Sequence, residues 1–442
     1  MRNTLVAAPV IEDFYGIEFD TQIANPSCKR IGRAEFHVTL PIQSRMRRCL
    51  LKDDGTVNYY LNPNNSTLKA DGTPATLDGT DGMVMVEIPA HWRKFETEGT
   101  KRRVKLAMFK LDGFHFVPKT YRSAYEATID RTNSSLQKLA SVVNTSTNFR
   151  GGNPNTAGIA SWDGTYRSVL GLPATAVPLS DFRGYARNRG TAGKNGVGWN
   201  CDVYEIHKTC YWLYVVEYAN FNSRLPFNPQ PTGEGFKQGG LGDGAYYLSG
   251  LSAYNTVNPV IPCGYTNSLG NNTGTVPFTM PAQYGSTVNF GIPSYRGIEN
   301  ILGHVGSSTD GISIIVQGIT PPPYTAFYIF RDPVNFGANI SFADLSTTFS
   351  STGSYITNIF FADYGDIAPT AAVGGSSTTF FAAYVTAAIV PPNSTDRIIV
   401  FGGFINTNTP SNILNMDCNL RFISGVQQVN GAIGTRLCFI PN

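Results

Sequence analysis

The chain has 442 residues, 42 % of them hydrophobic, so it is long enough for two or three domains with substantial cores. The formal net charge is only +3, and lysine and arginine are too sparse to suggest a surface for a phosphate backbone. No apolar run approaches 18 residues and no signal peptide is recognisable, so neither a membrane span nor secretion is expected. The 45 glycines and 27 prolines predict many short strands joined by loops.

The N-terminal third differs from the rest in charge and pattern. Residues 1–150 hold 21 Lys and Arg against 16 Asp and Glu, a net +5, whereas the remainder holds 13 against 15, a net −2. Residues 1–30 are interpreted as an extended arm. Residues 31–150 are interpreted as a small β-rich domain with a terminal linker, because MVMVEIPAHW and similar runs alternate with Asp-Gly turns. The segment KLDGFHF (110–116) predicts a hairpin that turns at Asp112-Gly113.

The clearest helix is predicted over residues 202–221. Apolar side chains recur there with a spacing of three and four, at Val203, Ile206, Cys210 and Leu213. Asp202 and Glu205 match a capping box, and Pro226 prevents continuation. Tyrosine and tryptophan on more than one other side indicate a helix that is buried on most of its circumference. A shorter helix is expected at 180–188, and the terminal strand IGTRLCFIP (433–441) is expected to be buried on both faces.

Several separated blocks carry a family resemblance. In chain order they are IGRAEFHVTLPIQSRMRRCLLKDDGTVNYYLNP (31–63), DGMVMVEIPAHWRKFETEG (81–99), LPATAVPLSDFRGYARNRG (172–190), the helix with its flanks at 200–223, GFKQGGLGDGA (235–245), SYRGIENILGHVGSSTDGI (294–312), GGSSTTFF (374–381) and IGTRLCFIPN (433–442). Together they resemble phage host-binding proteins of the tropism-determinant group, which includes proteins diversified by retroelements. These proteins carry a C-type-lectin-like domain of the formylglycine-generating-enzyme-like subtype. One departure is Val305–Ser308, where relatives usually have aromatic residues.

The resemblance implies an α+β fold, with a C-type-lectin-like receptor-binding domain at 151–442 preceded by the β-rich virion-docking domain. It also implies that receptor-reading positions lie in the C-terminal segment, which is rich in aromatic and asparagine side chains. Such side chains stack on sugars and supply adaptable hydrogen bonds. The candidate receptor-binding residues are Phe380, Phe381, Tyr384, Phe404, Asn406, Asn408, Asn412 and Asn415.

Metal, cofactor and catalytic sites are not expected. The five histidines are scattered, and His207 with Cys210 at helical spacing is better explained by packing than by a metal. Calcium triplets of sugar-binding lectins and a serine nucleophile elbow are absent from the sequence. Seven scattered cysteines without a C-x-x-C predict buried thiols and no disulfide framework.

The sequence therefore predicts a non-enzymatic phage virion protein of the tail or fibre, assembled in the bacterial cytoplasm. It would bind a host glycan or protein receptor without metal, contact other virion proteins through residues 1–150, and form a homo-oligomer, expected to be a trimer. Two alternatives remain open. One is a purely structural fibre, head or collar component, and the other is a polysaccharide-degrading tail enzyme.

Overall fold

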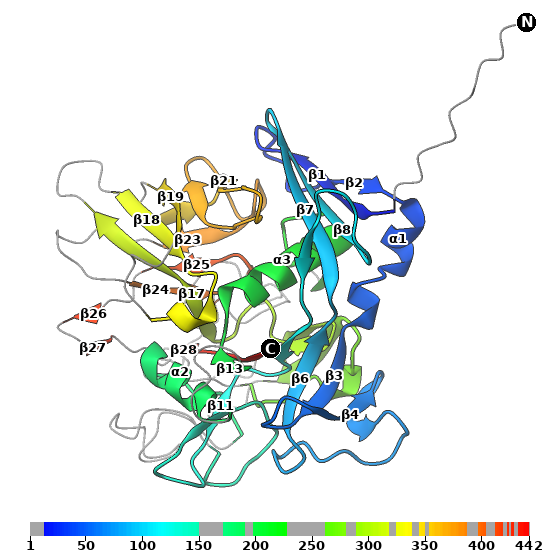
Figure 1. Cartoon of the computed structure of the whole chain (residues 1–442), viewed down its shortest axis with the longest axis vertical. Helices are drawn as coiled ribbons and strands as arrows, with labels where there is room; N and C mark the ends of the chain where they lie inside the picture. Colours follow the sequence, from blue (N-terminus) through cyan, green and yellow to red (C-terminus); the bar gives the residue numbers. More distant parts are fainter. Residues whose placement is uncertain are drawn as a thin grey trace, which may run out of the picture.

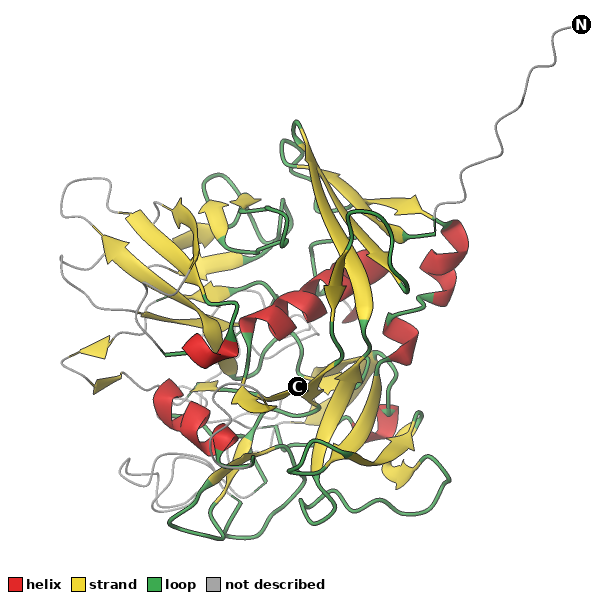
Figure 2. Cartoon of the chain, in the orientation of Figure 1, coloured by secondary structure: helices red, strands yellow, loops and turns green. Residues whose placement is uncertain are grey.

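The fold is built mainly from β-strands (Figures 1 and 2). A computed structural model describes residues 13–149, 171–190, 198–227, 261–279, 289–317, 324–337, 344–349, 353–386, 397–403, 412–418, 422–423, 426–427 and 432–441. About 40 % of these residues lie in strands and 14 % in helices. The α+β prediction is therefore wrong, and the fold is β-rich. The strongly patterned helix near residue 210 is real, but the rest of the described chain adds only two short helices to it.

Two of the sheets contain the N-terminal strands. The five-stranded sheet has the order β2 (Lys29–Gly32), β1 (Tyr15–Asp20), β8 (Lys101–Ala107), β7 (His91–Glu98) and β9 (His115–Val117). The seven-stranded sheet has the order β13 (Gly198–Cys201), β29 (Leu437–Ile440), β10 (Thr120–Ser123), β6 (Met83–Ile88), β3 (Arg47–Leu51), β4 (Val57–Asn62) and β5 (Asn65–Lys69).

The C-terminal strands form an eight-stranded sheet and smaller ones. The path of the largest is β19 (Asp344–Phe349), β18 (Tyr324–Ile329), β17 (Gly306–Gln317), β24 (Arg397–Phe401), β25 (Met416–Asp417), β23 (Tyr384–Thr386) and β20 (Gly353–Tyr355), with β28 (Ile433–Gly434) parallel to β17. The smaller sheets are β14 (Gly274–Thr279), β15 (Asn289–Tyr295) and β16 (Ile298–Glu299); β11 (Thr128–Asp130) and β12 (Lys138–Ala140); β21 (Asn358–Ile359) and β22 (Pro369–Ala371); and β26 (Phe422–Ile423) and β27 (Val426–Gln427).

The described α-helices are α1 (Ala34–Thr39), α2 (Leu179–Arg187) and α3 (Tyr204–Tyr218), and short 3-10 turns include Gln43–Arg45 and Leu225–Phe227. Thirteen of the 15 residues of α3 are buried, which explains why its apolar and aromatic residues occupy every face. Figure 1 shows α3 between the five-stranded and eight-stranded sheets. The helices predicted at 180–188 and 202–221 are confirmed in type and approximate position.

Side-chain hydrogen bonds fix α3 against three distant segments. Gln43 Nε2 donates to the Leu213 carbonyl at 3.0 Å, and Trp212 Nε1 donates to the Gly365 carbonyl at 2.7 Å. The Tyr295 hydroxyl donates to Glu217 at 3.0 Å. Because each bond satisfies a buried polar group, the helix has one defined position in the core.

The predicted domain boundary near residue 150 does not separate two cores in the described residues. The C-terminal strand β29 pairs with β10 on one side and with β13 on the other, so one sheet contains strands from both predicted domains. The predicted arm also contributes to the core, because β1 lies between β2 and β8 and its Tyr15 and Ile17 are fully buried. The segment predicted as one terminal strand forms two, β28 and β29, and it is buried through Cys438 but half-buried from Phe439 to Pro441. The pairing of β29 joins the two parts of the chain.

Two local predictions fail for identifiable reasons. Asp202 does not cap α3: the N-cap is Val203, and no side chain makes a capping bond there. The Asp202 carboxylate instead accepts hydrogen bonds from Arg122 and Ser307. The turn at Asp112-Gly113 exists, but β9 beyond it pairs with β7 and does not form a hairpin with β8.

Candidate functional site

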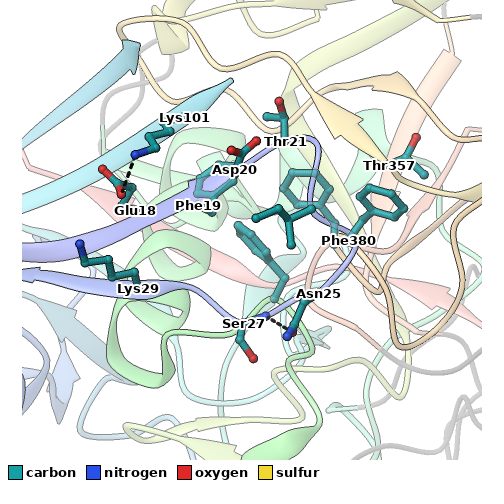
Figure 3. Close-up of a pocket in the computed structure, with 13 residues that line it drawn as sticks. Glu18, Phe19, Asp20, Thr21, Asn25, Ser27, Lys29, Lys101, Thr357 and Phe380 are labelled. Carbon is teal, nitrogen blue, oxygen red and sulfur yellow. Dashed lines mark hydrogen bonds and ion pairs between the residues drawn. The ribbon is translucent and has the colours of Figure 1, made fainter. Parts of the chain in front are cut away.

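The pocket that includes predicted receptor residues lies between the end of β1 and the loop at 377–381 (Figure 3). Its volume is about 220 Å³. Three separate parts of the chain build it: residues 18–29, the segment after α3, and the 377–381 loop, with single residues from β8 and from position 357. Its lining residues are Glu18, Phe19, Asp20, Thr21, Ile23, Asn25, Ser27, Lys29, Lys101, Phe221, Thr357, Phe380 and Phe381.

Aromatic rings form the floor of the pocket. Phe19, Phe221 and Phe381 make a compact triad, with ring centroids 4.8 Å apart for Phe19 and Phe221 and 4.6 Å apart for Phe221 and Phe381. The Phe19 and Phe221 rings are nearly perpendicular, an arrangement that favours edge-to-face attraction. All three rings are buried, whereas Ile23 at the mouth is 55 % exposed. The floor is therefore rigid and apolar, and it can pack against the face of a ring.

Charged groups line one side of the rim. Glu18 accepts a hydrogen bond from Arg103 Nε at 2.7 Å and lies 3.9 Å from Lys101 Nζ. The Arg103 hydrogen bond lowers the pKa of Glu18, and the backbone N–H of Gln22 lowers the pKa of Asp20. Both carboxylates are thus ionised at neutral pH. With two lysines and two acids, the formal charge of the lining is zero, and the rim offers both donors and acceptors.

Backbone hydrogen bonds hold the pocket wall in place. Asn25 Oδ1 accepts from the Ser27 N–H at 3.0 Å, which folds residues 25–27 into a turn. The Cys28 N–H then donates to the carbonyl of Ala219 at the end of α3. The Phe380 N–H donates to the Ala24 carbonyl at 2.6 Å. These contacts connect the N-terminal loop, the main helix and the 377–381 loop.

The backbone is unusual at Phe380 in the 377–381 loop and at Ala382, the residue directly after the loop. Phe380 has φ 51° and Ala382 has φ 49°, a left-handed region that costs non-glycine residues about 1–2 kcal/mol each. Such conformations persist only where the surrounding structure imposes them, and they are frequent at functional sites. Here they direct Phe381 into the floor and leave Phe380 half-buried beside Thr357 (Figure 3).

The structure divides the eight predicted receptor residues into three groups. Phe380 and Phe381 line the pocket, and Tyr384 is half-buried on β23 against Tyr355, with ring centroids 5.1 Å apart. Asn412 and Asn415 are buried and hydrogen-bond to backbone, so they are scaffold residues in this structure and not exposed contacts. The other three lie outside the described residues: Phe404, Asn406 and Asn408.

Sequence reasoning missed the N-terminal half of the pocket. Glu18, Asp20 and Lys29 fall in the segment interpreted as an arm, and Lys101 falls in the predicted β-rich domain, with no role assigned to it. The pairing of β1 with β8 brings them together, with Glu18 opposite Arg103 and Asp20 opposite Lys101. Apolar residues at every second position of YGIEFD, namely Tyr15, Ile17 and Phe19, are a local signal for the strand β1. No local pattern indicates that β1 pairs with β8.

The histidine and cysteine predictions agree with the structure. His207 Nδ1 lies 3.2 Å from Arg122 Nη2 and Nε2 lies 3.1 Å from the Ile413 carbonyl, which makes Nδ1 the acceptor and Nε2–H the donor. Burial lowers the pKa of His207 to about 3, so the ring is neutral. All seven cysteines are free thiols, and six of them are buried.

Other features of the described residues bear on function. No group of three or more His, Cys, Asp and Glu side chains among them is arranged to hold a metal ion. No helix in the same part of the chain is long and apolar enough to span a membrane.

The two carboxyl groups that line the pocket differ from the general acid of a glycosidase. Such an acid is a carboxyl group with a raised pKa, whereas the pKa values of Glu18 and Asp20 are both lowered.

No family model matches the chain, and a search of curated proteins finds no significant match.

Proposed function

We propose that the chain is a phage virion protein that binds a host-surface glycan through the pocket between β1 and the 377–381 loop. The observation that carries the proposal is the combination of a rigid phenylalanine floor with an ionic rim of zero formal charge. Aromatic faces pack against sugar rings, while carboxylates and ammonium groups bond to hydroxyls. The resemblance to phage host-binding proteins of the tropism-determinant group supplies the virion context.

The size and charge of the pocket suggest the ligand class. Sites for drug-sized ligands enclose roughly 300–1,000 Å³, so a cavity of about 220 Å³ suits a single ring of a longer chain. A neutral sugar matches the balanced charges of Glu18, Asp20, Lys29 and Lys101. Weak binding of one ring per site is compatible with adhesion if several copies act together, because linked sites raise avidity. A homotrimer of this chain in the virion is part of the proposal.

Attachment to other virion proteins is assigned to residues 1–150. This part carries the net charge of +5, and the side chains of Arg47, Lys101 and Lys119 are about half exposed. Exposed cations favour contact with an acidic neighbouring subunit. A purely structural virion role is the alternative, and it requires no ligand in the pocket.

The test is an array of neutral and charged glycans probed with the purified chain. Wild-type protein should retain at least one neutral glycan. Thr357→Arg, which adds a long side chain at the mouth, and Phe380→Ala should reduce retention at least about tenfold if a ring stacks there. Tyr384→Ala is the matched control, since Tyr384 is an aromatic residue of the same region but does not line the pocket. Absence of glycan binding, or unchanged binding by Thr357→Arg, would favour the structural role.

A further inference from the structure

The strand β9 lies at the edge of the five-stranded sheet, and its outer side has no partner strand among the described residues. In the sheet order β2-β1-β8-β7-β9 it pairs with β7 alone. Apart from that pairing, no hydrogen bond between described residues reaches the backbone of residues 115–118. An edge strand directs the N–H and C=O groups of alternate residues outward, where they can pair with one more strand.

A cavity of about 430 Å³, which we call the β9 groove, lies along this edge. All three residues of β9 line it, although neighbouring residues of a strand point to opposite faces of a sheet. Phe116 is opposite Trp92, with ring centroids 5.1 Å apart, and His115 is opposite Arg93. The groove therefore runs along the open edge and not over one face. It shares no lining residue with the pocket at β1, so an inference about it is independent of the proposed glycan site.

The β9 groove exposes aromatic surface and has balanced charges. The Phe116 side chain is 55 % exposed and that of Tyr364 is 49 % exposed. The formally charged lining residues are two cations and two carboxylates: Arg93, Arg331, Glu205 and Asp363. Glu205 accepts from Arg93 at 3.2 Å and from Arg331 at 3.1 Å, so these charges compensate one another. Exposed apolar rings beside a compensated set of charges favour an uncharged, apolar occupant.

The N-terminal segment of the chain has this chemistry. Residues 1–12, MRNTLVAAPVIE, lie outside the described part of the chain. Between Arg2 and Glu12 the sequence carries no charge, and most of its side chains are apolar. Pro9 has no N–H to donate to a neighbouring strand, so a paired strand in this segment falls before it.

The described chain begins close enough to the β9 groove for this segment to reach it. The ring of Phe14 lies 6.4 Å from that of Phe114, the residue directly before β9. The strand registers place Tyr15 in line with His115 across β8 and β7. At roughly 4.8 Å per strand, a strand outside β9 lies about 19 Å from β1. Eight extended residues span about 26 Å, so residues 4–6 can lie beside β9.

We propose that residues 4–6 of the same chain pair with β9 as a sixth strand of this sheet. A chain that arrives from β1 meets β9 at His115 and continues toward Val117, which makes the pairing antiparallel and places Leu5 opposite Phe116. Main-chain hydrogen bonds then satisfy the outer edge of β9, and apolar side chains cover its exposed aromatic surface. The added strand also closes an edge that could otherwise pair with another copy of the chain.

The decisive measurement is a disulfide cross-link in the full chain that carries Leu5→Cys and Phe116→Cys. Opposed residues of an antiparallel pair have Cα atoms roughly 4.5–5.5 Å apart, within the span of about 4.4–6.8 Å that a disulfide bridges. Oxidised glutathione should join the two cysteines within one chain, as measured by peptide mapping under non-reducing conditions. The control pair is Leu5→Cys with Phe109→Cys, since Phe109 is 47 % exposed but does not line the groove.

The Leu5–Phe116 pair should form at least about tenfold more intramolecular product than the control pair, because pairing holds the two positions together. A covalent dimer would show that a second copy occupies the groove, and it would overturn the assignment to the same chain. Equal yields from the two pairs, or no product from either, would overturn the pairing itself.

Hydrogen exchange tests the same contact with β9 unaltered. Leu5→Asp in the full chain should speed exchange of the backbone amides of residues 115–117 at least about tenfold, because a charge disfavours the apolar groove and releases the strand. Leu5→Val should retain the slow exchange of the wild type. Val373→Asp is the matched charge control, since Val373 is 80 % exposed and does not line the groove. Unchanged exchange in Leu5→Asp would overturn the proposal even if the Phe116→Cys chain failed to fold.

Discussion

Arg122 and Asp202 form a two-point ion pair in the interior of the protein. Arg122 Nε lies 3.1 Å from Oδ1 and Nη2 lies 2.7 Å from Oδ2 of Asp202. Their side chains are 2 % and 0 % exposed. The pair connects β10 of the N-terminal part to Asp202, two residues before the start of α3. This pair explains why Asp202, which the sequence predicts as the cap of α3, does not cap the helix. Its carboxylate instead accepts hydrogen bonds from the buried guanidinium of Arg122 and neutralises its charge.

The first prediction concerns this pair. Asp202→Ala should lower the free energy of unfolding by about 3–5 kcal/mol, because removal of one partner leaves a buried, uncompensated charge. Urea denaturation of the purified chain measures this. The control is Asp13→Ala, since Asp13 pairs with Arg33 on the surface and both side chains are about 40 % exposed. That change should stay within about 0.5 kcal/mol. Similar losses in both variants would show that the buried pair has no special role.

The second prediction is a loss of stability in mild acid. Burial lowers the pKa of His207 to about 3 and that of His91 to about 4. Each folded-state value lies below the unfolded value of about 6.5. The unfolded chain therefore binds protons first, and the stability present above pH 6.5 decreases as the pH falls toward 4. The expected loss between pH 7 and pH 5 is about 2 kcal/mol for each histidine.

Urea denaturation at both pH values provides the measurement, with His91→Gln as the comparison. That variant should lose less stability than the wild type between pH 7 and pH 5, whatever its stability at pH 7. An identical pH dependence in the two proteins would mean that His91 is protonated in the folded state or that its burial is incomplete.

The third prediction tests the packing of α3. Leu213 is 1 % exposed, and Leu213→Ala should cost about 2–5 kcal/mol through lost contacts and a cavity. Val38 is on the short helix α1 and is 83 % exposed, so Val38→Ala should change stability by less than about 0.5 kcal/mol. Thermal and urea unfolding of both variants check this difference.

How far the sequence predicts the fold depends on how local each signal is. The residues of α3 specify a helix by their own spacing, and its burial on all sides follows from aromatic residues such as Tyr211 and Trp212. The pairing of β29 with β10 joins Cys438 to Arg122, more than 300 positions apart, and no local pattern specifies it. The α+β class was wrong because it was inferred from local patterns, and the same patterns carry no trace of the pairing of β29 across the predicted boundary at 150.

The candidate site was predictable only in part, because sequence patterns indicate residue types but not the contacts that distant residues make in the fold. Phe380 and Phe381 were predicted because the resemblance implies receptor-reading aromatic residues in the C-terminal segment, and both line the pocket. Asn412 and Asn415 were chosen for their residue type, but an amide side chain serves equally well to bond buried backbone. Residue type alone therefore does not distinguish an asparagine that contacts a ligand from one that hydrogen-bonds to buried backbone.

The fourth prediction revises the role of the N-terminal arm. Removal of residues 1–12 should leave the β-rich fold intact, since the described strands begin at Tyr15. Removal of residues 1–20 also deletes β1, which pairs with both β2 and β8, and should abolish cooperative unfolding. Circular dichroism melts of the two truncated chains make the comparison. A cooperative melt in the shorter chain would show that β1 is dispensable for the core.

The fifth prediction distinguishes residues that contact a ligand in the pocket from residues that only hold the pocket in shape. Asn412 Nδ2 lies within hydrogen-bond distance of the carbonyls of Phe221, Phe381 and Ala382, and its Oδ1 accepts from the Leu414 N–H at 2.9 Å. Asn412 therefore holds the pocket floor and does not touch a ligand. Asn412→Asp keeps the size and the acceptor but loses the donor, and it adds a buried charge.

Asn412→Asp should thus lower the free energy of unfolding by about 1–3 kcal/mol, and more if the carboxylate stays ionised. Phe380→Ala should behave in the opposite way, with little change in stability but weaker glycan retention, because Phe380 is half-buried at the pocket wall. Both variants are measured by urea denaturation and by glycan retention on the same preparations. If Asn412→Asp keeps wild-type stability and loses only glycan binding, Asn412 is a ligand contact, and the positioning role assigned to its side chain is wrong.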